Sequence, residues 1–309
     1  MLVGCMPLGG TWDDTPHDPA RVDATLALID TAIEAGLTAF DHADIYCRGK
    51  SETVFGLALR QRPGLRDHIF LQSKCGIRFA NDPAPGAPQR YDFSRAHIVA
   101  SVDAILSRLQ TDRLDALLLH RPDALAEPEE IAAAFDELLR AGKVLHFGVS
   151  NHNAAQVERL AAALSVPLFA NQVEFNLLRH ELVSDGFLAN RPDAAYTGSH
   201  GLLDTCQRLG IGLQAWGPLA QGKLVNPGPD DPLALHELSA ALRRLAAARE
   251  TDPETVAIAW ILRHPARIAP VTGTSDPARL LRCAAALDLV LTREEWYGLL
   301  HAARGRPLP

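Results

Sequence analysis

The sequence lacks the patterns that mark several large classes of protein. No apolar run reaches the roughly 18 residues of a membrane-spanning helix, and the N-terminus has neither a basic start nor a cleavable apolar segment. No stretch is strongly basic, and 30 Lys and Arg residues against 37 Asp and Glu residues give a net charge of −7. We therefore expect no nucleic-acid partner, no membrane partner and a cytoplasmic location.

Cysteine and metal-binding patterns are equally sparse. The five cysteines form no C-x-x-C pair, which argues against a disulfide framework and against a thiolate zinc site. The twelve histidines include no H-E-x-x-H and no other helical pair at ligand spacing beside a carboxylate. The sequence therefore predicts free thiols and no bound metal.

Short apolar runs alternate with amphipathic stretches along the whole chain, without repeats, low-complexity tracts or a linker between dissimilar halves. The amphipathic stretches predict helices, including one over 242–262 and a last one over 277–287 before a C-terminal tail. The apolar runs predict eight strands, over 2–5, 37–41, 68–74, 114–120, 144–150, 168–172, 211–216 and 268–272.

Alternation of this kind indicates a parallel sheet with right-handed crossovers. Eight strand-helix units without a G-x-G-x-x-G after the first strand favour an α/β fold of the closed (β/α)8 TIM barrel type over a doubly wound open sheet. Hydrophobic residues make up 47% and charged residues 22% of the 309 residues, as in ordinary globular proteins. We expect one domain over residues 1–309.

Four polar side chains stand where predicted strands end, which is where barrel enzymes place their chemistry. Asp41 ends the second strand and Tyr46 follows five residues later, while Lys74 ends the third strand and His120 the fourth. Taken singly, these residues would suit a turn cap, a packing residue, a rim charge and a core histidine. However, neighbouring strands are only about 4.8 Å apart. A buried Lys74 also needs a partner such as Asp41, so we expect the four side chains to converge.

This combination predicts acid catalysis on a carbonyl group. Asp41 would keep Lys74 charged, and the ammonium would lower the pKa of Tyr46 from about 10. Tyr46 would protonate a carbonyl oxygen that a neutral His120 orients. The set contains no nucleophile or metal, so a nicotinamide hydride is the simplest reductant.

Two other functions stay open on the residues alone. In a Schiff-base aldolase, Lys74 would attack a carbonyl in its neutral form, which Asp41 opposes. In a redox sensor, the chain would bind a cofactor without useful turnover.

Residues 41–46, D-H-A-D-I-Y, resemble the D-x-A-x-x-Y motif of the aldo-keto reductases, and Lys74 and His120 stand at the places of the family's other two catalytic residues. Residues 148–151, G-V-S-N, are identical to another family motif. The resemblance covers nearly the whole chain. It implies an eight-stranded barrel that uses NADPH, in preference to NADH, without a Rossmann domain, and that reduces a small-molecule aldehyde or ketone.

The resemblance also implies a set of cofactor contacts. Ser150, Asn151 and Gln172 would hold the nicotinamide carboxamide, and Trp216 would stack on the nicotinamide ring. Helix capping and filling of the barrel mouth are the corresponding structural alternatives. The segment that follows would lie over the pyrophosphate, with contacts from Gly217, Pro218, Leu219, Gln221, Gly222 and Lys223.

Residues 217–223 also fit the phosphate-loop pattern G-x-x-x-x-G-K in part. Leu224 stands where a phosphate loop has its magnesium-binding Ser or Thr, which argues against an NTPase. After the eighth strand, backbone N–H groups near Gly273 and Thr274 and the guanidinium of Arg279 are candidates for the 2'-phosphate.

Three features depart from the family pattern. Gly273 replaces a common Lys, and Cys283 replaces an Asn that often contacts adenine. The family usually carries a short hairpin before the first strand, whereas here the first strand already covers 2–5, so we expect the hairpin to be missing. The end of that strand would then face the nicotinamide beside Asp41, through Gly4, Cys5 and Met6.

Trp12, Phe79 and Tyr91 are the predicted substrate contacts in addition to Tyr46, His120 and Trp216. Their apolar surfaces suit aldehydes or ketones with hydrophobic groups. The sequence names neither the physiological substrate nor the oligomeric state.

Overall fold

A computed structural model of the chain describes residues 1–188 and 201–309. Eight parallel strands form a closed barrel in the hydrogen-bonding order β1, β10, β9, β8, β7, β6, β3, β2, which confirms the predicted TIM barrel. Every strand begins and ends within two residues of the predicted range. Their bounds are β1 Leu2–Gly4, β2 Ala39–Asp41, β3 Phe70–Cys75, β6 Leu114–Leu119, β7 Val144–Ser150, β8 Leu168–Glu174, β9 Gly212–Trp216 and β10 Ala269–Thr272.

Helices separate the barrel strands. The α-helices are α1 Ala20–Glu34, α2 Lys50–Arg60, α3 Arg95–Leu109, α4 Pro128–Arg140, α5 Ala154–Ala163, α6 Glu181–Ser184, α7 Leu202–Arg208, α8 Leu233–Ala248, α9 Pro253–Leu262, α10 Pro277–Ala284 and α11 Arg293–Arg304. Short 3-10 turns occur at η1 Met6–Gly9, η2 Tyr46–Gly49, η3 Leu65–His68, η4 Asp185–Leu188, η5 Ala220–Gly222 and η6 Ala285–Leu287.

Two sequence predictions for the C-terminal third were wrong. The single helix predicted over 242–262 is two helices, because α9 starts afresh at Pro253, a residue that suits a first helical turn but breaks a helix interior. The predicted C-terminal tail contains α11. Its N-terminus is a capping box in which Thr292 and Glu295 each accept a hydrogen bond from the other's backbone N–H.

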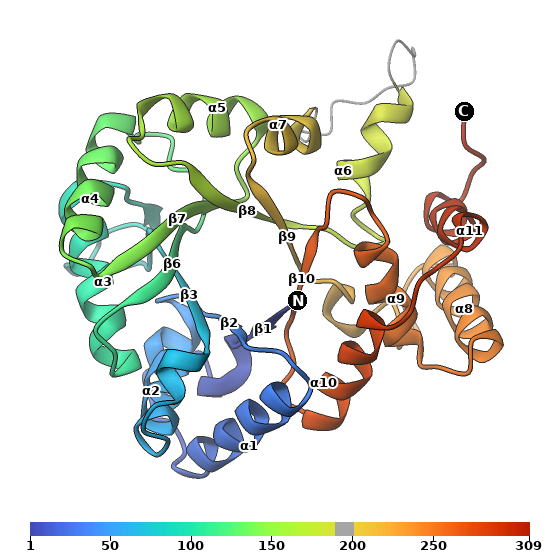
Figure 1. The fold of residues 1–309 in the computed structure, drawn as a ribbon, viewed down its shortest axis with the longest axis horizontal. Coiled ribbons are helices and arrows are strands. Elements are labelled where there is room, and N and C mark those ends of the chain that lie inside the picture. Colours follow the sequence, from blue (N-terminus) through green and yellow to red (C-terminus); the bar gives the residue numbers. More distant parts are fainter. Residues whose placement is uncertain (189–200) are drawn as a thin grey trace. The chain divides into compact units, whose positions relative to one another are not determined.

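The described residues divide into two compact units. One comprises Leu2–Asn171 and Gly273–Pro277; the other comprises Met1 and the described parts of Gln172–Thr272 and Ala278–Pro309. We call them the large and the small unit. In the large unit, α1 to α5 lie outside β2, β3, β6 and β7 (Figure 1).

Strand register in the large unit offsets the candidate catalytic residues by two positions from each strand to the next. Asp41 pairs with Gly4 of β1 on one side and with Gln72 of β3 on the other. Lys74 pairs with Leu118 of β6, two residues before His120. The polar residues therefore follow a buried apolar layer at the carboxyl ends of the strands.

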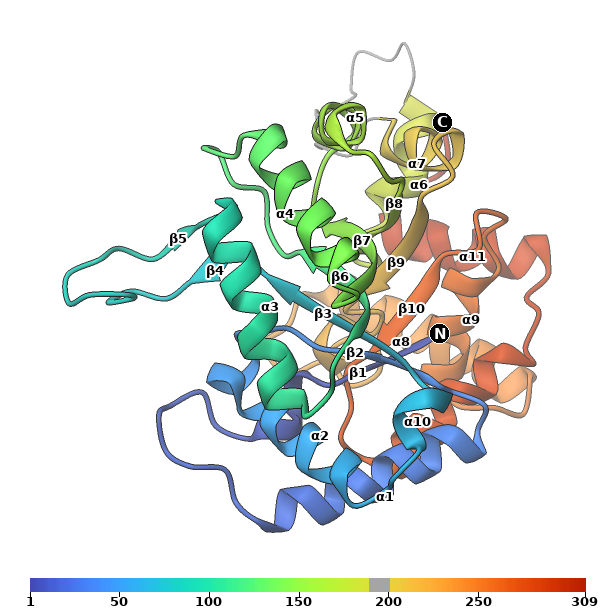
Figure 2. The same cartoon turned by 60° about the vertical axis from the view of Figure 1, so that its left-hand side comes forward.

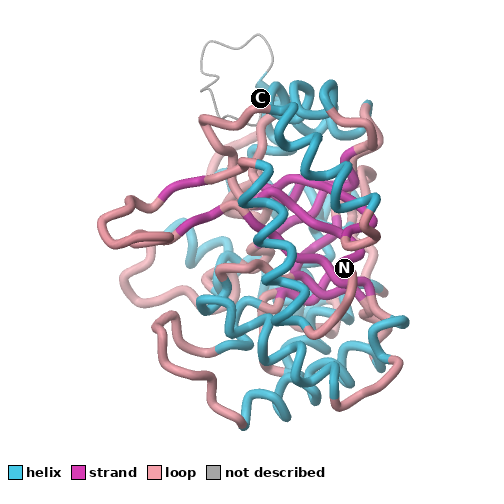
Figure 3. Tube along the Cα trace, turned by 90° about the vertical axis from the view of Figure 1, so that its left-hand side faces the viewer, coloured by secondary structure: helices cyan, strands magenta, loops and turns pink. Residues whose placement is uncertain are grey.

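A two-stranded hairpin leaves the large unit after β3. It consists of β4 Ile77–Arg78 and β5 Arg90–Tyr91, which are antiparallel, and it projects away from α3 (Figures 2 and 3). At the base of this hairpin, Arg78 forms ion pairs with Asp82 and Asp92, each at 2.9 Å. The Pro-rich stretch over 81–89, predicted as a loop, is the tip of this hairpin.

In the small unit, Trp260 and Trp296 join α9 to α11. Their rings stack with centroids 5.1 Å apart, and each indole N–H donates to the other residue's backbone oxygen, at 3.1 and 2.9 Å. Trp260 is fully buried, so this reciprocal contact anchors the C-terminal helix to the core of the unit.

All five cysteines are free and buried. Among residues 1–188 and 201–309, no group of three or more His, Cys, Asp and Glu side chains is arranged to hold a metal ion. None of the helices in those ranges combines the length and apolar character needed to cross a bilayer.

Candidate active site

The ammonium of Lys74 is the centre of a buried polar cluster in the large unit. Its Nζ lies 2.7 Å from Asp41 Oδ2, 2.7 Å from the backbone oxygen of His42 and 3.1 Å from the Tyr46 hydroxyl. The side chains of Lys74 and Asp41 are 0% and 2% exposed. The Nζ atom of Lys74 thus contacts both Asp41, its predicted ion-pair partner, and Tyr46, the predicted acid.

His120 lies against the ring of Tyr46. The two ring centroids are 5.9 Å apart, and the planes meet at 82°. Burial and the positive charges of Lys74 and Arg121 hold the pKa of His120 well below its usual value, so the imidazole is neutral near pH 7. Its Nδ1 is buried and has no hydrogen-bond partner among the residues that the structure describes.

The direction of the pKa shift of Lys74 agrees with the sequence analysis, whereas that of Tyr46 does not. Burial works against the ammonium, but Asp41 and Tyr46 outweigh it and raise the pKa of Lys74. For Tyr46, burial raises the pKa above its ordinary value, and Lys74 offsets only part of that rise. The predicted net lowering of the Tyr46 pKa was therefore wrong, because desolvation of the phenolate exceeds the stabilisation that the ammonium gives it.

An unusual backbone turn presents Tyr46. The two residues after it, Cys47 and Arg48, both have left-handed backbone angles, with φ of 49° and 58°. Residues other than glycine rarely adopt these backbone angles, so tertiary contacts must stabilise the turn. The buried thiol of Cys47 provides two of them, lying 3.3 Å from the backbone oxygen of Met6 and 3.2 Å from that of Gly10.

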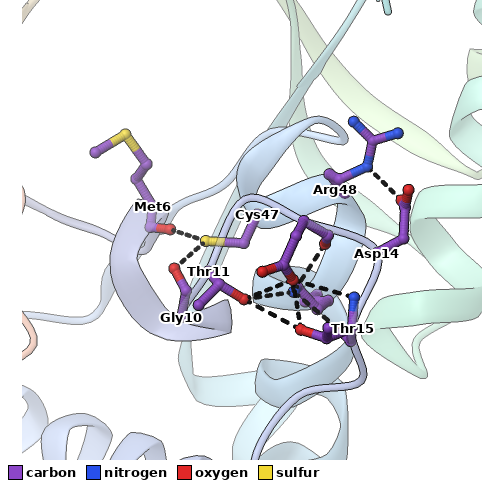
Figure 4. Close-up of polar contacts among 9 residues, drawn as sticks. Met6, Gly10, Thr11, Asp14, Thr15, Cys47 and Arg48 are labelled. Atoms are coloured by element: carbon purple, nitrogen blue, oxygen red, sulfur yellow. Dashed lines mark hydrogen bonds and ion pairs between the residues drawn. The ribbon is translucent and has the colours of Figure 1, made fainter.

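Lys50 binds the loop after β1, whose residues Met6 and Gly10 also contact Cys47 of this turn (Figure 4). Its ammonium lies 3.1 Å from Thr11 Oγ1, 3.0 Å from the backbone oxygen of Asp13 and 2.9 Å from that of Thr15. Arg48 adds an ion pair to Asp14. The β1 loop and the turn of Tyr46 therefore form one connected polar structure, which the sequence analysis did not foresee.

The three predicted substrate residues lie on loops after β1 and β3. Trp12 is 47% exposed within the β1 loop, and Tyr91 is 42% exposed on β5 of the hairpin. Phe79 lies under the guanidinium of Arg48, whose central carbon is 4.7 Å from the ring centroid. Arg48 thus connects Phe79 to the turn of Tyr46.

Several predicted cofactor residues lie in the large unit, close to the polar cluster around Lys74. Asn151 has a left-handed φ of 60°, and its Nδ2 donates to the backbone oxygen of His120 at 3.1 Å and to Ser150 Oγ at 2.8 Å. At the end of β1, Gly4 precedes the buried Cys5, whose N–H donates to the backbone oxygen of Asp41 at 2.9 Å. Met6 is 46% exposed.

Other predicted cofactor residues belong to the small unit. Gln172 is buried and donates through Nε2 to Gln214 Oε1 at 2.8 Å. Trp216 ends β9 with a half-buried side chain, and Gly217 follows with a left-handed φ of 64°. Pro218 is buried, Leu219 and Gly222 are half-buried, and Gln221 is exposed. Lys223, predicted for the pyrophosphate, pairs with Asp231 at 2.9 Å.

The segment after β10 contains the predicted phosphate residues. Thr274 is buried, and its hydroxyl accepts a hydrogen bond from the Asp276 N–H at 3.0 Å just before α10. Gly273 is exposed. Arg279 is exposed in the small unit and forms no ion pair with any described residue, whereas Cys283 is buried there.

Two buried glutamines near the predicted residues were missed. Gln72 Nε2 donates to Asp41 Oδ1 at 2.6 Å, and Gln214 accepts from Gln172. Each stands two residues before a predicted functional residue, Lys74 or Trp216, and strand residues at that spacing face the same side. A polar residue two positions upstream was the sequence signal.

Comparison with known proteins agrees with this geometry. The model of the Aldo/keto reductase family matches residues 1–299. The chain belongs to the aldo/keto reductase family. Members of this family are oxidoreductases that use nicotinamide cofactors, and the protein is therefore an oxidoreductase.

Relatives and solved structures extend over nearly the whole chain. A 6-dehydroglucose reductase of Agrobacterium fabrum is 36% identical over 301 residues, covering 96% of this chain and 93% of the relative. An uncharacterised oxidoreductase of Bacillus subtilis, YcsN, is 36% identical over 285 residues, covering 92% and 89%. A thermostable aldo-keto reductase crystallised with the inhibitor epalrestat matches with a TM-score of 0.75 at 25% identity, covering 97% and 94%. A glycerol dehydrogenase from Gluconobacter oxydans shares the fold, with a TM-score of 0.82 at 20% identity, covering 100% and 93%.

Proposed function

We propose that this aldo/keto reductase uses NADPH to reduce aldehydes or ketones to alcohols, with Tyr46 as the general acid. The observation that carries the proposal is the hydrogen-bonded series from Asp41 through Lys74 to the Tyr46 hydroxyl, with neutral His120 against the Tyr46 ring. This series supplies a proton donor, a fixed positive charge and a neutral hydrogen-bonding group. It contains no nucleophile suited to acyl or phosphoryl transfer.

The chain's own residues manage the proton and the negative charge. Bound NADPH supplies the hydride that adds to the carbonyl carbon. The Tyr46 hydroxyl gives its proton to the carbonyl oxygen, and the phenolate left behind lies beside the Lys74 ammonium until water returns a proton. His120 orients the carbonyl oxygen, and Asp41 holds Lys74 in its charged state.

The residues proposed for the cofactor offer chemistry that suits it. A carboxamide needs donors and acceptors, which the Ser150 hydroxyl and the amides of Asn151 and Gln172 provide. The exposed guanidinium of Arg279 is not engaged in an ion pair with described residues and is proposed, with Thr274, for the 2'-phosphate. On this basis we propose NADP rather than NAD as the cofactor.

A Schiff-base aldolase is disfavoured by the same cluster. That reaction needs the neutral amine of Lys74 as a nucleophile. The raised pKa of Lys74 keeps the nitrogen protonated, and its contacts with Asp41, His42 and Tyr46 occupy its donors.

Fluorescence titration with NADPH and with NADH tests the cofactor, and turnover of a panel of aldehydes and ketones tests the activity. We expect Tyr46→Phe to lower kcat by at least roughly 100-fold while NADPH still binds, as for loss of a general acid. Tyr297→Phe, on α11 in the small unit, is the matched control. Near-normal turnover in the Tyr46 variant would remove this residue from the mechanism, and NADPH binding without oxidation across the panel would indicate a sensor.

A further inference from the structure

Two buried glutamines on barrel strands form hydrogen bonds with residues of the proposed site. Gln72 contacts Asp41, which is proposed for catalysis, and Gln214 contacts Gln172, which is proposed for cofactor binding. Gln72 on β3 is 0% exposed, and Gln214 on β9 is 5% exposed. Burying an amide side chain destabilises the folded state unless the amide forms hydrogen bonds, so the partner of each glutamine indicates its role. Gln72 belongs to the large unit and Gln214 to the small unit.

Gln72 acts as a donor. Its Nε2 donates to Asp41 Oδ1 at 2.6 Å, while Lys74 donates to the other oxygen, Oδ2, at 2.7 Å. The two oxygens of one buried carboxylate are thus held by an amide and by an ammonium. Without the amide, the Asp41 carboxylate loses one of the hydrogen bonds that fix its orientation, so its pairing with Lys74 is less well defined.

Gln214 acts as an acceptor. Its Oε1 accepts from Gln172 Nε2 at 2.8 Å. An amide presents different groups on its two sides, so this bond fixes the Gln172 amide with its NH2 toward Gln214 and its oxygen turned away. A carboxamide ligand distinguishes the two orientations, because its NH2 group needs an acceptor and its oxygen needs a donor.

We propose that Gln72 and Gln214 are positioning residues for two separate tasks: Gln72 fixes Asp41 against Lys74 for proton transfer by Tyr46, and Gln214 fixes the Gln172 amide for the nicotinamide carboxamide. The inference rests on the proposed function. It predicts opposite responses to the same substitution, because one glutamine serves as a donor and the other as an acceptor.

Glutamate distinguishes the two roles. Gln214→Glu keeps an oxygen that accepts from Gln172, so we expect NADPH affinity within about threefold of the parent, whereas Gln214→Met should weaken it by at least about fivefold. Gln72→Glu loses the donor and adds a like charge beside Asp41, so we expect its hydride-transfer rate to be lower than that of Gln72→Met. Gln72→Met itself should lower the hydride-transfer rate by at least about tenfold with NADPH affinity unchanged.

The measurements are NADPH binding by fluorescence titration and the single-turnover rate with benzaldehyde between pH 5 and about pH 11.5, a range that extends past the ordinary pKa values of Tyr and Lys. In Gln72→Met, loosened pairing lets Lys74 lose its proton earlier, so the alkaline fall of the rate should begin at a lower pH. Gln214→Met should leave the position of this fall unchanged. If a Gln72 variant does not fold, Gln72→Asn serves instead, because its shorter amide is withdrawn from Asp41 and the same shift is expected.

The outcomes separate the inference from the proposed function. Equal losses in both methionine variants, with the alkaline fall and the NADPH affinity both unmoved, would show a purely structural role and overturn the inference. Failure of the parent protein to bind NADPH, or full activity in Tyr46→Phe, would overturn the proposed function whatever the glutamine variants do. Both roles would be supported if Gln214→Glu keeps the NADPH affinity that Gln214→Met loses, while Gln72→Glu has a lower hydride-transfer rate than Gln72→Met.

Discussion

Arg108 on α3 donates through Nε to Glu52 Oε2 on α2 at 2.7 Å, and the Glu52 side chain is fully buried. Its other oxygen accepts from the Ser73 hydroxyl at 2.6 Å, one residue before Lys74. Burial raises the pKa of Glu52, and Arg108 counters that rise. This ion pair therefore joins two helices to the strand that carries Lys74, the lysine proposed for catalysis.

Arg108→Met should destabilise the protein by about 3 kcal/mol or more, because it leaves a buried carboxylate without its counter-charge. The matched control is Arg62→Met, which removes an ion pair with Asp30 whose side chains are 50% and 41% exposed. That change should cost no more than about 1 kcal/mol. Urea unfolding at pH 7 measures both, and similar losses would show that the buried pair has no special weight.

His42 should make stability depend on pH. Burial, with the charge of Lys74, lowers its pKa to about 3, and neither ring nitrogen has a hydrogen-bond partner in residues 1–188 and 201–309. An unfolded histidine takes up a proton below about pH 6.5. The folded chain does not protonate His42 until about pH 3, so stability present above pH 6.5 is lost as the pH falls between these values.

His42→Leu removes this proton uptake. Between pH 7 and pH 5, its unfolding free energy should fall by about 2 kcal/mol less than that of the parent, at about 1.4 kcal/mol per pH unit below pH 6.5. Denaturant unfolding at several pH values provides the measurement, with exposed His301→Leu as the control. Parallel pH curves for the parent and the His42 variant would contradict the prediction.

The barrel was predictable because its strands are buried on both faces. Runs such as 114–120 are nearly continuous in apolar residues, and each ends at a polar residue or turn. The spacing of Thr292 and Glu295 is that of a capping box, so the start of α11 is also encoded locally in the sequence. The break before α9 was marked by Pro253.

The detail of the site depends on contacts that no local pattern encodes. Asp41, Lys74 and His120 were found because each ends a predicted strand, and Tyr46 because it follows in the loop after the second. The net direction of the Tyr46 pKa shift, however, depends on desolvation, which only packing determines. The left-handed angle of Cys47 is permitted by contacts with Met6 and Gly10, some 40 residues away in sequence. Lys50 likewise meets a loop that precedes it by more than 30 residues.

Lys50 should control the order of the β1 loop. Lys50→Met removes the ammonium that joins Thr11, Asp13 and Thr15, so amide hydrogen exchange over residues 10–15 should quicken by at least about tenfold. Lys143→Met, which removes a more exposed pair with Asp103, is the control and should leave this exchange unchanged. If Trp12 contacts substrate, the Lys50 variant should raise KM with little change in kcat. Unchanged exchange would show that other contacts order the loop.

Reduction and its reverse should respond differently to pH. Reduction needs the protonated hydroxyl of Tyr46, whereas alcohol oxidation needs its phenolate. Because the Tyr46 pKa is raised above its ordinary value of 10, the hydroxyl is protonated throughout the neutral range. The reduction rate should therefore be flat between pH 6 and pH 9 and fall only at higher pH, while the oxidation rate should rise about tenfold per pH unit over the same range. Single-turnover rates in the two directions provide the measurement, and an oxidation rate already at its plateau near pH 7 would place the working pKa of Tyr46 far lower and contradict this reading of the buried cluster.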